Sequence, residues 1–205
     1  MENIIEKIEY KGYEIEIFQS DYPEDPRGWD NLGTMICFHN RYDLGDKHNY
    51  YDPDEFIEDM KNEKVIILPL YLYDHSGITI STGPFGCPWD SGQVGYIYVT
   101  YEDIKKEFSY KNITTKRIEK IKDYLRGEVE TYDNYLTGNI YGYNIEDVDS
   151  CSGYFGDPEK SGLLDEAKDM IDYEIEHNLK NHLSLLKQWI KKSVPLDKRY
   201  KFQTA

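Results

Sequence analysis

The stretch that decides the fold reads VIILPLYLY (65–73), DHSGITISTGPFGCPWDSG (74–92) and QVGYIYVT (93–100). Its first and last segments are apolar, aromatic and β-branched, so they predict β-strands. Within the Gly- and Pro-rich middle segment, ITIS (78–81) predicts a short strand that returns antiparallel to the first. Pro69 has no amide donor and therefore predicts an edge position or a bulge. Three antiparallel strands thus frame a loop-rich segment of the kind that carries functional residues.

Upstream of this stretch the sequence predicts more β-structure. Residues 4–10 and 13–19 alternate apolar and polar side chains across a Lys-Gly pair, which is typical of a β-hairpin. Residues 20–33 are rich in Pro, Gly, Asp and Asn and predict an ordered loop anchored by Trp29. The next run, TMICFH (34–39), predicts a short buried strand.

Several other segments predict helices. Asp52 followed by proline is an N-cap signal for a short helix. Thr100 and Asp103 have the capping-box spacing before a helix over residues 101–108, and Thr114 or Thr115 caps a longer helix that Gly138 ends. Residues 139–147 and 150–155 predict a second hairpin that completes the sheet. Residues 161–192 form the longest periodic segment, which fits one long helix or two consecutive ones. Its first half is acidic and its last turns hold lysines, as the helix dipole favours.

Together these elements predict a single α+β domain over residues 1–205, with a mainly antiparallel β-sheet covered by C-terminal helices. Residues 1–157 form its sheet region with embedded helices, residues 158–194 its C-terminal helical segment, and residues 195–205 a loose tail. No repeat, low-complexity tract or linker divides the chain. The 20 tyrosines, 7 phenylalanines and 3 tryptophans provide the large side chains that a folded core needs.

The sequence predicts a protein that stays in the cytoplasm. Its N-terminal residues are charged throughout, and no apolar run approaches the roughly 18 residues that a membrane-spanning helix needs. The three cysteines, Cys37, Cys87 and Cys151, are widely spaced and form no CxxC pair. They therefore predict reduced thiols and indicate neither a disulfide framework nor a zinc ribbon.

The formal net charge of the chain is −15, and the acid is concentrated near the N-terminus. Residues 1–63 hold 17 Asp and Glu against 6 Lys and Arg, a net charge of −11. A field of this sign repels phosphate backbones and anionic membranes and attracts basic partners. A negative charge also serves solubility alone. Composition therefore disfavours direct nucleic-acid or membrane binding, and it favours either a basic protein partner or a role limited to solubility.

Polar, reactive side chains gather at three places: after the 34–39 strand, at the turn after residue 73, and in the loop before residue 93. If the sheet brings these places together, they form the rim of one pocket. The candidate partner- or ligand-binding residues are His39, Arg41, Asp46, Asp74, His75, Trp89 and Asp90. An exposed tryptophan among Tyr, Arg and Asp residues has the composition of a binding hot spot. We therefore expect a recognition surface here rather than an active site.

Two other interpretations of these residues stay open. Histidine and aspartate can hold a divalent ion or transfer protons, and Cys87 is a candidate nucleophile, but the HExxH, GxSxG, P-loop and GxGxxG spacings are all missing. Taken one at a time, the same residues also fit structural roles such as closing turns and filling gaps. We therefore assign no catalytic residue, no metal ligand and no cofactor.

Three stretches of the sequence, PRGWDNLGTMICFHNRYDLGD, LYLYDHSGITISTGPFGCPWDSGQVGYIYV and YLTGNIYGYNIEDVDSCSGYFG, resemble a family of small proteins carried by bacteriophages, prophages and plasmids. The resemblance covers most of residues 1–157 and carries no catalytic residues with it. What it implies is a setting: the host cytoplasm during infection. There, small acidic phage proteins often inhibit host defence by occupying nucleic-acid-binding grooves.

We therefore expect a non-enzymatic phage or mobile-element protein that binds and inhibits a bacterial host protein with a basic surface. A defence nuclease of the CRISPR or restriction type, inhibited through mimicry of DNA, would fit. The alternative is a small enzyme or ligand-binding protein for a nucleotide or phosphorylated small molecule, with Arg41 clamping phosphate beside His39, Asp74, His75 and Asp90. A third possibility is a homo-oligomer that assembles through the C-terminal helix. Convergence of the His and Asp side chains in one concave pocket would favour the alternative over the first hypothesis.

Overall fold

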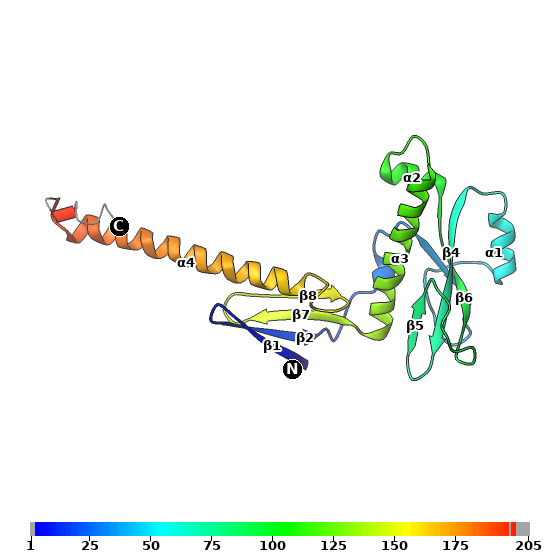
Figure 1. The fold of residues 1–205 in the computed structure, drawn as a ribbon, viewed down its shortest axis with the longest axis horizontal. Helices are drawn as coiled ribbons and strands as arrows, with labels where there is room; N and C mark the ends of the chain where they lie inside the picture. The colour runs from blue at the N-terminus through cyan, green and yellow to red at the C-terminus, as the bar shows by residue number, and fades with distance from the viewer. Residues whose placement is uncertain (1–2, 197, 200–205) are drawn as a thin grey trace. The chain divides into compact units, whose positions relative to one another are not determined.

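The computed structural model describes residues 3–196 and 198–199 and confirms an α+β fold (Figure 1). The strands of this part of the chain are β1 (Asn3–Tyr10), β2 (Tyr13–Gln19), β3 (Thr34–Cys37), β4 (Val65–Asp74), β5 (Ile78–Ser81), β6 (Ser91–Thr100), β7 (Ile140–Ile145) and β8 (Asp149–Phe155). They form two four-stranded sheets, where the sequence predicted one. The strand order is β1-β2-β7-β8 in the first sheet and β3-β6-β4-β5 in the second.

The chain divides into two compact units, which are described separately below. Unit 2 comprises Ser20–Ile140 and Phe155–Asp157 and contains the second sheet. Unit 1 comprises the described residues of 1–19, 141–154 and 158–205 and contains most of the first sheet.

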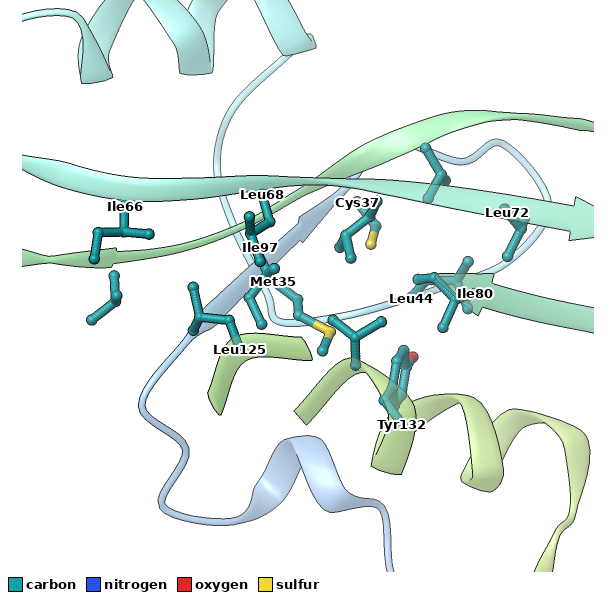
Figure 2. Close-up of a cluster of buried hydrophobic side chains, with 14 of the residues drawn as sticks. Met35, Cys37, Leu44, Ile66, Leu68, Leu72, Ile80, Ile97, Leu125 and Tyr132 are labelled. Atoms are coloured by element: carbon teal, nitrogen blue, oxygen red, sulfur yellow. The ribbon is translucent and has the colours of Figure 1, made fainter. Parts of the chain in front are cut away.

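In unit 2, β6 is the central strand, because it pairs antiparallel with both β3 and β4. Every second side chain of β4 is buried on one face of the sheet, and these residues are Ile66, Leu68, Leu70 and Leu72. Helix α3 (Thr115–Thr137) packs Leu125 and Tyr132 against that face. The core of unit 2 therefore lies between the sheet and α3 (Figure 2).

Pro69 lies where β4 has one hydrogen-bonded neighbour instead of two. It is opposite Tyr96 of β6, while β5 pairs only with residues 71–74 of β4. The register between β4 and β6 shifts directly afterwards, between Leu70 and Tyr71. Both features that the sequence predicted from the missing amide, an edge-like position and a bulge, are therefore confirmed.

The opposite face of the unit 2 sheet is partly covered by α1 (Pro53–Met60), so that α1 and α3 lie on opposite sides of β4 and β6 (Figure 1). Phe56 of α1 contacts the rings of Tyr96 and Tyr98, with centroids 5.4 and 5.3 Å away. Asp52 caps this helix as predicted, because its side chain accepts a hydrogen bond from a backbone N–H of the first turn.

Two of the remaining helix signals of unit 2 are confirmed, whereas Thr114 precedes α3 without a side-chain capping hydrogen bond. Helix α2 (Tyr101–Phe108) follows β6 without a loop, and the Thr100 hydroxyl accepts from Asp103 N at its N-terminus. Helix α3 ends at Gly138, whose φ of 72° lies in the left-handed region that a helix C-cap favours.

Arg27, rather than Trp29, anchors the loop of residues 20–33. The Arg27 side chain is 5% exposed, and its Nη2 donates to Asp46 Oδ2 at 2.6 Å and to the Gly33 carbonyl at 2.7 Å. Trp29 is half-exposed and packs its ring edge-on against Phe155. The loop is therefore held chiefly by a buried charge, which its turn-forming composition did not indicate.

In unit 1, the predicted β1–β2 hairpin is confirmed, and β2 pairs antiparallel with β7. One continuous helix, α4 (Leu163–Ser193), follows these strands in the chain and buries Leu163, Ala167 and Ile171 in a cluster with Ile15, Ile17, Tyr143 and Ile145 of the sheet. Lys11, in the β1–β2 turn, forms an ion pair with Asp172 of α4 at 2.6 Å. The loose tail predicted for residues 195–205 lies largely outside the described residues.

Across the described residues, no helix has the length and apolarity required to cross a membrane. Cys37, Cys87 and Cys151 are free thiols, as the sequence predicted. Burial raises the pKa of the Cys37 thiol to about 12, so this side chain is a packing residue and a poor nucleophile.

Candidate functional site

The topology of the unit 2 sheet brings three chain segments to one end of it. Because β6 runs antiparallel to both β3 and β4, the start of β6 lies beside the ends of its two neighbours. Two backbone bonds extend the pairing past the strands: Phe38 N donates to Val94 O at 2.7 Å, and Asp74 N donates to Asp90 O at 2.8 Å. The three places that the sequence singled out therefore do meet.

A pocket of about 350 Å³ lies at this end of the sheet. Five of the seven candidate residues line it: His39, Arg41, Asp74, Trp89 and Asp90. Its remaining lining residues are Phe38, Leu72, Ser91, Gly92, Gln93 and Val94. The pocket is thus a mostly polar hollow with a few apolar side chains from β4 and β6.

Asp74 has two side-chain partners at this pocket. It forms an ion pair with Arg41 Nη2, and Tyr42 Oη donates to its other oxygen at 3.4 Å. The Asp74 side chain is 20% exposed, whereas that of Arg41 is 68% exposed. The carboxylate is therefore held in place, while the guanidinium can move into solvent at little cost.

His39 is oriented by the backbone of the turn that follows it. Its Nδ1 accepts from Arg41 N at 3.3 Å and from Tyr42 N at 3.2 Å. The ring also stacks on Tyr42, with centroids 4.9 Å apart. Since a neutral imidazole carries one proton, this arrangement places it on Nε2 and makes that nitrogen a hydrogen-bond donor.

Asp90 connects the pocket to His75, which does not line it. Asp90 Oδ2 lies 3.5 Å from His75 Nδ1 and 3.5 Å from Cys87 Sγ. His75 is largely exposed at the turn after β4. The two histidines and two aspartates therefore do not form one cluster: His39 and the carboxylates share the pocket, and His75 contacts Asp90 at its margin.

Trp89 presents its indole to solvent, with 92% of its surface exposed. The turn that carries it is closed by Ser91 Oγ, which donates to the Cys87 carbonyl at 2.5 Å. A large apolar ring held in this way at the rim of a polar pocket is available for contact with another molecule.

Asp46 has a structural position apart from the pocket. It accepts from Arg27 Nε at 3.0 Å and from Met35 N at 2.7 Å. Nearby, Glu128 of α3 accepts from Leu32 N at 2.8 Å and lies 3.5 Å from the Arg27 guanidinium. These charges join the 20–33 loop to β3 and α3.

Three polar residues at the site were not among the candidate binding residues: Tyr42, Ser91 and Gln93. Tyr42 and Ser91 lie in the segments that the sequence singled out, whereas Gln93 was not noticed. Tyr42 follows Arg41 directly, and its signal was the mixed polar and aromatic run after β3. Sequence reasoning also missed an apolar groove of about 580 Å³ on α3, lined by Trp29, Tyr124 and Gly127 among others. Its residues come from a loop and a helix far apart in the chain, so no local pattern marks it.

In the described part of the chain, no group of three or more His, Cys, Asp and Glu side chains is arranged to hold a metal ion. The pocket offers two carboxylates, one exposed guanidinium, an imidazole N–H and an exposed indole, which suit charged and hydrogen-bonding groups.

Comparison with known proteins gives no family assignment. No family model matches the chain, and no curated protein or solved structure matches it significantly.

Proposed function

We propose that this protein is an acidic binding protein that captures a basic surface of a bacterial host protein, with the pocket at the ends of β3 and β4 as its contact centre. The observation that carries the proposal is the exposed Trp89 indole beside the Asp74 and Asp90 carboxylates. Carboxylates below an aromatic face form the combination that attracts a lysine or arginine side chain.

The exchange of one guanidinium for another is the proposed binding step. Arg41 neutralises Asp74 in the free protein, but its side chain is mostly in solvent. A cation from the partner replaces it on Asp74, while the indole of Trp89 covers the incoming group. The exposed ion pair contributes about 0.2–1 kcal/mol, so its loss is easily compensated by a better shielded one.

The acidic residues of unit 2 support this proposal, because they attract a basic partner before contact. Helix α1 and its N-cap carry Asp52, Asp54, Glu55, Glu58 and Asp59, all at least partly exposed. A negative field of this kind raises the rate of encounter with a basic partner and repels nucleic acid. The acid of β1 and β2 belongs to unit 1, so the charge of the first 63 residues is divided between the units.

The resemblance to proteins of phages and plasmids supplies the setting for the proposal. The partner we propose is a host defence protein that binds nucleic acid, such as a CRISPR effector or restriction enzyme. Its groove is basic because it accepts phosphates, so an acidic protein can occupy it by mimicking DNA. Inhibition of that host protein in the cytoplasm is the proposed role.

Capture of partners from bacterial lysate, with mass-spectrometric identification at low and moderate salt, tests this function. We expect a basic, nucleic-acid-binding protein that Trp89→Ala and Asp90→Asn each retain at least tenfold less. Tyr22→Ala is the matched control, because Tyr22 is 96% exposed in unit 2 but does not line the pocket. Equal capture by all variants, or capture of no basic partner, would contradict the proposal.

A second candidate function is binding of a phosphorylated small molecule or nucleotide. It is favoured by the concave shape of the pocket and by the guanidinium of Arg41 beside the Nε2–H donor of His39. Arg41→Met separates the two functions. It removes the phosphate clamp and abolishes any thermal shift with nucleotides, whereas it frees Asp74 and strengthens capture of a basic protein roughly two- to fivefold, the equivalent of one exposed ion pair.

A further inference from the structure

Helix α4 changes its environment along its length. Its first turns bury Leu163, Ala167 and Ile171 against the unit 1 sheet. The helix passes the β1–β2 turn at Asp172, which pairs with Lys11. Residues 173–193 then continue past the edge of the sheet for roughly six turns (Figure 1).

An apolar stripe runs along this projecting segment. Its members are Ile175, Leu179, Leu183, Leu186 and Ile190, all partly or largely exposed. They are spaced three or four residues apart, so they fall on one side of the helix. Trp189, which is 58% exposed, lies beside the stripe.

The face opposite the stripe is polar, so the projecting segment is amphipathic. That face carries His177, Asn181, Ser184 and Gln188, among others. A helix of this length with one exposed leucine-rich face gains stability mainly by burying that face against another element.

The charges on the segment show which occupant fits the stripe. Acid lies near its start, at Glu174 and Glu176, and lysines lie near its end, at Lys187, Lys191 and Lys192. A second copy in the antiparallel direction places the acidic end of one helix against the basic end of the other. A parallel copy places lysines beside lysines, which is unfavourable.

We propose that two copies of the chain pair antiparallel through residues 173–193 of α4. A two-fold axis at Leu183 explains both the apolar and the charged pattern. Leu183 then meets its own copy, Leu179 lies opposite the partner subunit's Leu186, and Ile175 lies opposite the partner subunit's Ile190.

The same axis pairs the charges that flank the stripe. Glu176, which borders the stripe, lies close to the partner subunit's Lys187, and the symmetry repeats this pair. Within one chain Glu176 already accepts from Lys180, but both side chains are mostly exposed, so that pair exchanges readily. The interface therefore combines a central apolar seam with complementary charges at both ends.

Sedimentation of the full chain, with light scattering across a concentration series, tests the pairing. We expect a dimer for the wild-type protein and a monomer for Leu183→Glu, because two carboxylates would meet at the axis. Leu185→Glu is the matched control: Leu185 is 64% exposed and lies roughly 200° around the helix from Leu183, so it stays dimeric. Unchanged circular dichroism in Leu183→Glu shows that loss of the dimer is not loss of the fold.

The direction of pairing is tested by charge reversal. Lys187→Glu weakens the dimer at least tenfold, because it places a second carboxylate beside the partner subunit's Glu176, and adding Glu176→Lys restores it if the helices are antiparallel. A wild-type monomer at high micromolar concentration, a dimer insensitive to Leu183→Glu, or failure of the reversed charges to restore pairing would overturn the proposal. So would binding of the monomer to anionic vesicles that Leu183→Glu abolishes, since the stripe would then face lipid.

Discussion

Two of the arginine–aspartate pairs in unit 2, Arg27–Asp46 and Arg41–Asp74, differ in how far solvent reaches the arginine. Arg27 is 5% exposed and is bonded to Asp46 and the Gly33 carbonyl. Arg41 is 68% exposed and pairs with Asp74 at the pocket. The two aspartates are alike, with Asp46 23% and Asp74 20% exposed, so the pairs differ in the arginine. Removal of Arg27 takes a buried cation from both Asp46 and Glu128, while removal of Arg41 takes a solvated cation from Asp74. Burial, not residue type, therefore separates a pair that holds the fold from one that is available to a partner.

The largest effect on stability is expected from removal of the buried Arg27 guanidinium. We expect Arg27→Met to lower the free energy of unfolding by about 3–5 kcal/mol, because it leaves Asp46 and Glu128 largely buried without their positive partner. Urea unfolding followed by circular dichroism measures the loss. A loss no larger than that of Arg41→Met would mean that the two pairs are equivalent after all.

A smaller loss of stability is expected from a change at Gly95, where β6 comes close to β3. A Cβ at Gly95 would overlap the backbone of Ile36 and Cys37 on β3, so Gly95→Ala forces β3 and β6 apart. We expect a loss of roughly 1–3 kcal/mol in the same unfolding measurement. Gly92→Ala is the control, since a Cβ there meets open space. Equal stability of the two variants would show that the strands adjust freely.

The exposed pair should have little effect on stability. Arg41→Met is expected to change the free energy of unfolding by less than about 0.5 kcal/mol, because a mostly solvated guanidinium contributes little. Its effect appears instead in partner capture from lysate. A large loss of stability would assign Arg41 to the fold and remove it from the binding site.

The smallest expected effect is a change of the unfolding free energy with pH, which arises from Glu128 beside the buried Arg27. Desolvation raises the pKa of Glu128 above the usual glutamate value, although the Leu32 and Gly33 N–H groups and Arg27 act to lower it. The folded state thus binds the proton of the Glu128 carboxyl group more tightly than the unfolded chain does. The contribution of Glu128 to stability therefore falls as pH rises from the usual glutamate range through the raised value, and it is constant above that.

Comparison with Glu128→Gln measures this contribution, since the variant cannot titrate. The unfolding free energy of the wild type minus that of Glu128→Gln should decrease as pH rises through this window. A difference that increases with pH would mean that the hydrogen bonds and Arg27 outweigh the burial of the carboxylate.

Much of the secondary structure could be predicted, because its signals are local. Asp52 with its following proline, Thr100 and Gly138 mark helix ends through their own side chains or backbone, and all three do so in the structure. The division into two sheets could not be predicted in this way. It depends on β2 pairing with β7, which joins Ile15 to Ile145, and no property of either segment alone specifies its partner.

The candidate site could also be predicted only in part. His39, Asp74 and Asp90 follow or precede strands that pair antiparallel, so their convergence follows from the topology of one sheet. Asp46 was assigned to the same site because it shares their chemistry. Its cation, Arg27, lies 19 residues earlier in a loop whose anchor was expected to be Trp29, and only the fold shows that the two are bonded.

The pairing of β2 with β7 also affects the order in which the chain can fold during synthesis. The β1–β2 hairpin leaves the ribosome first, but the strand that completes its sheet follows more than a hundred residues later. At 5–20 residues per second the hairpin waits roughly 6–25 s for β7, and longer for the α4 residues that cover Ile15 and Ile17. Glu14 and Glu16 alternate with these isoleucines, and such charges discourage edge-to-edge aggregation during the wait.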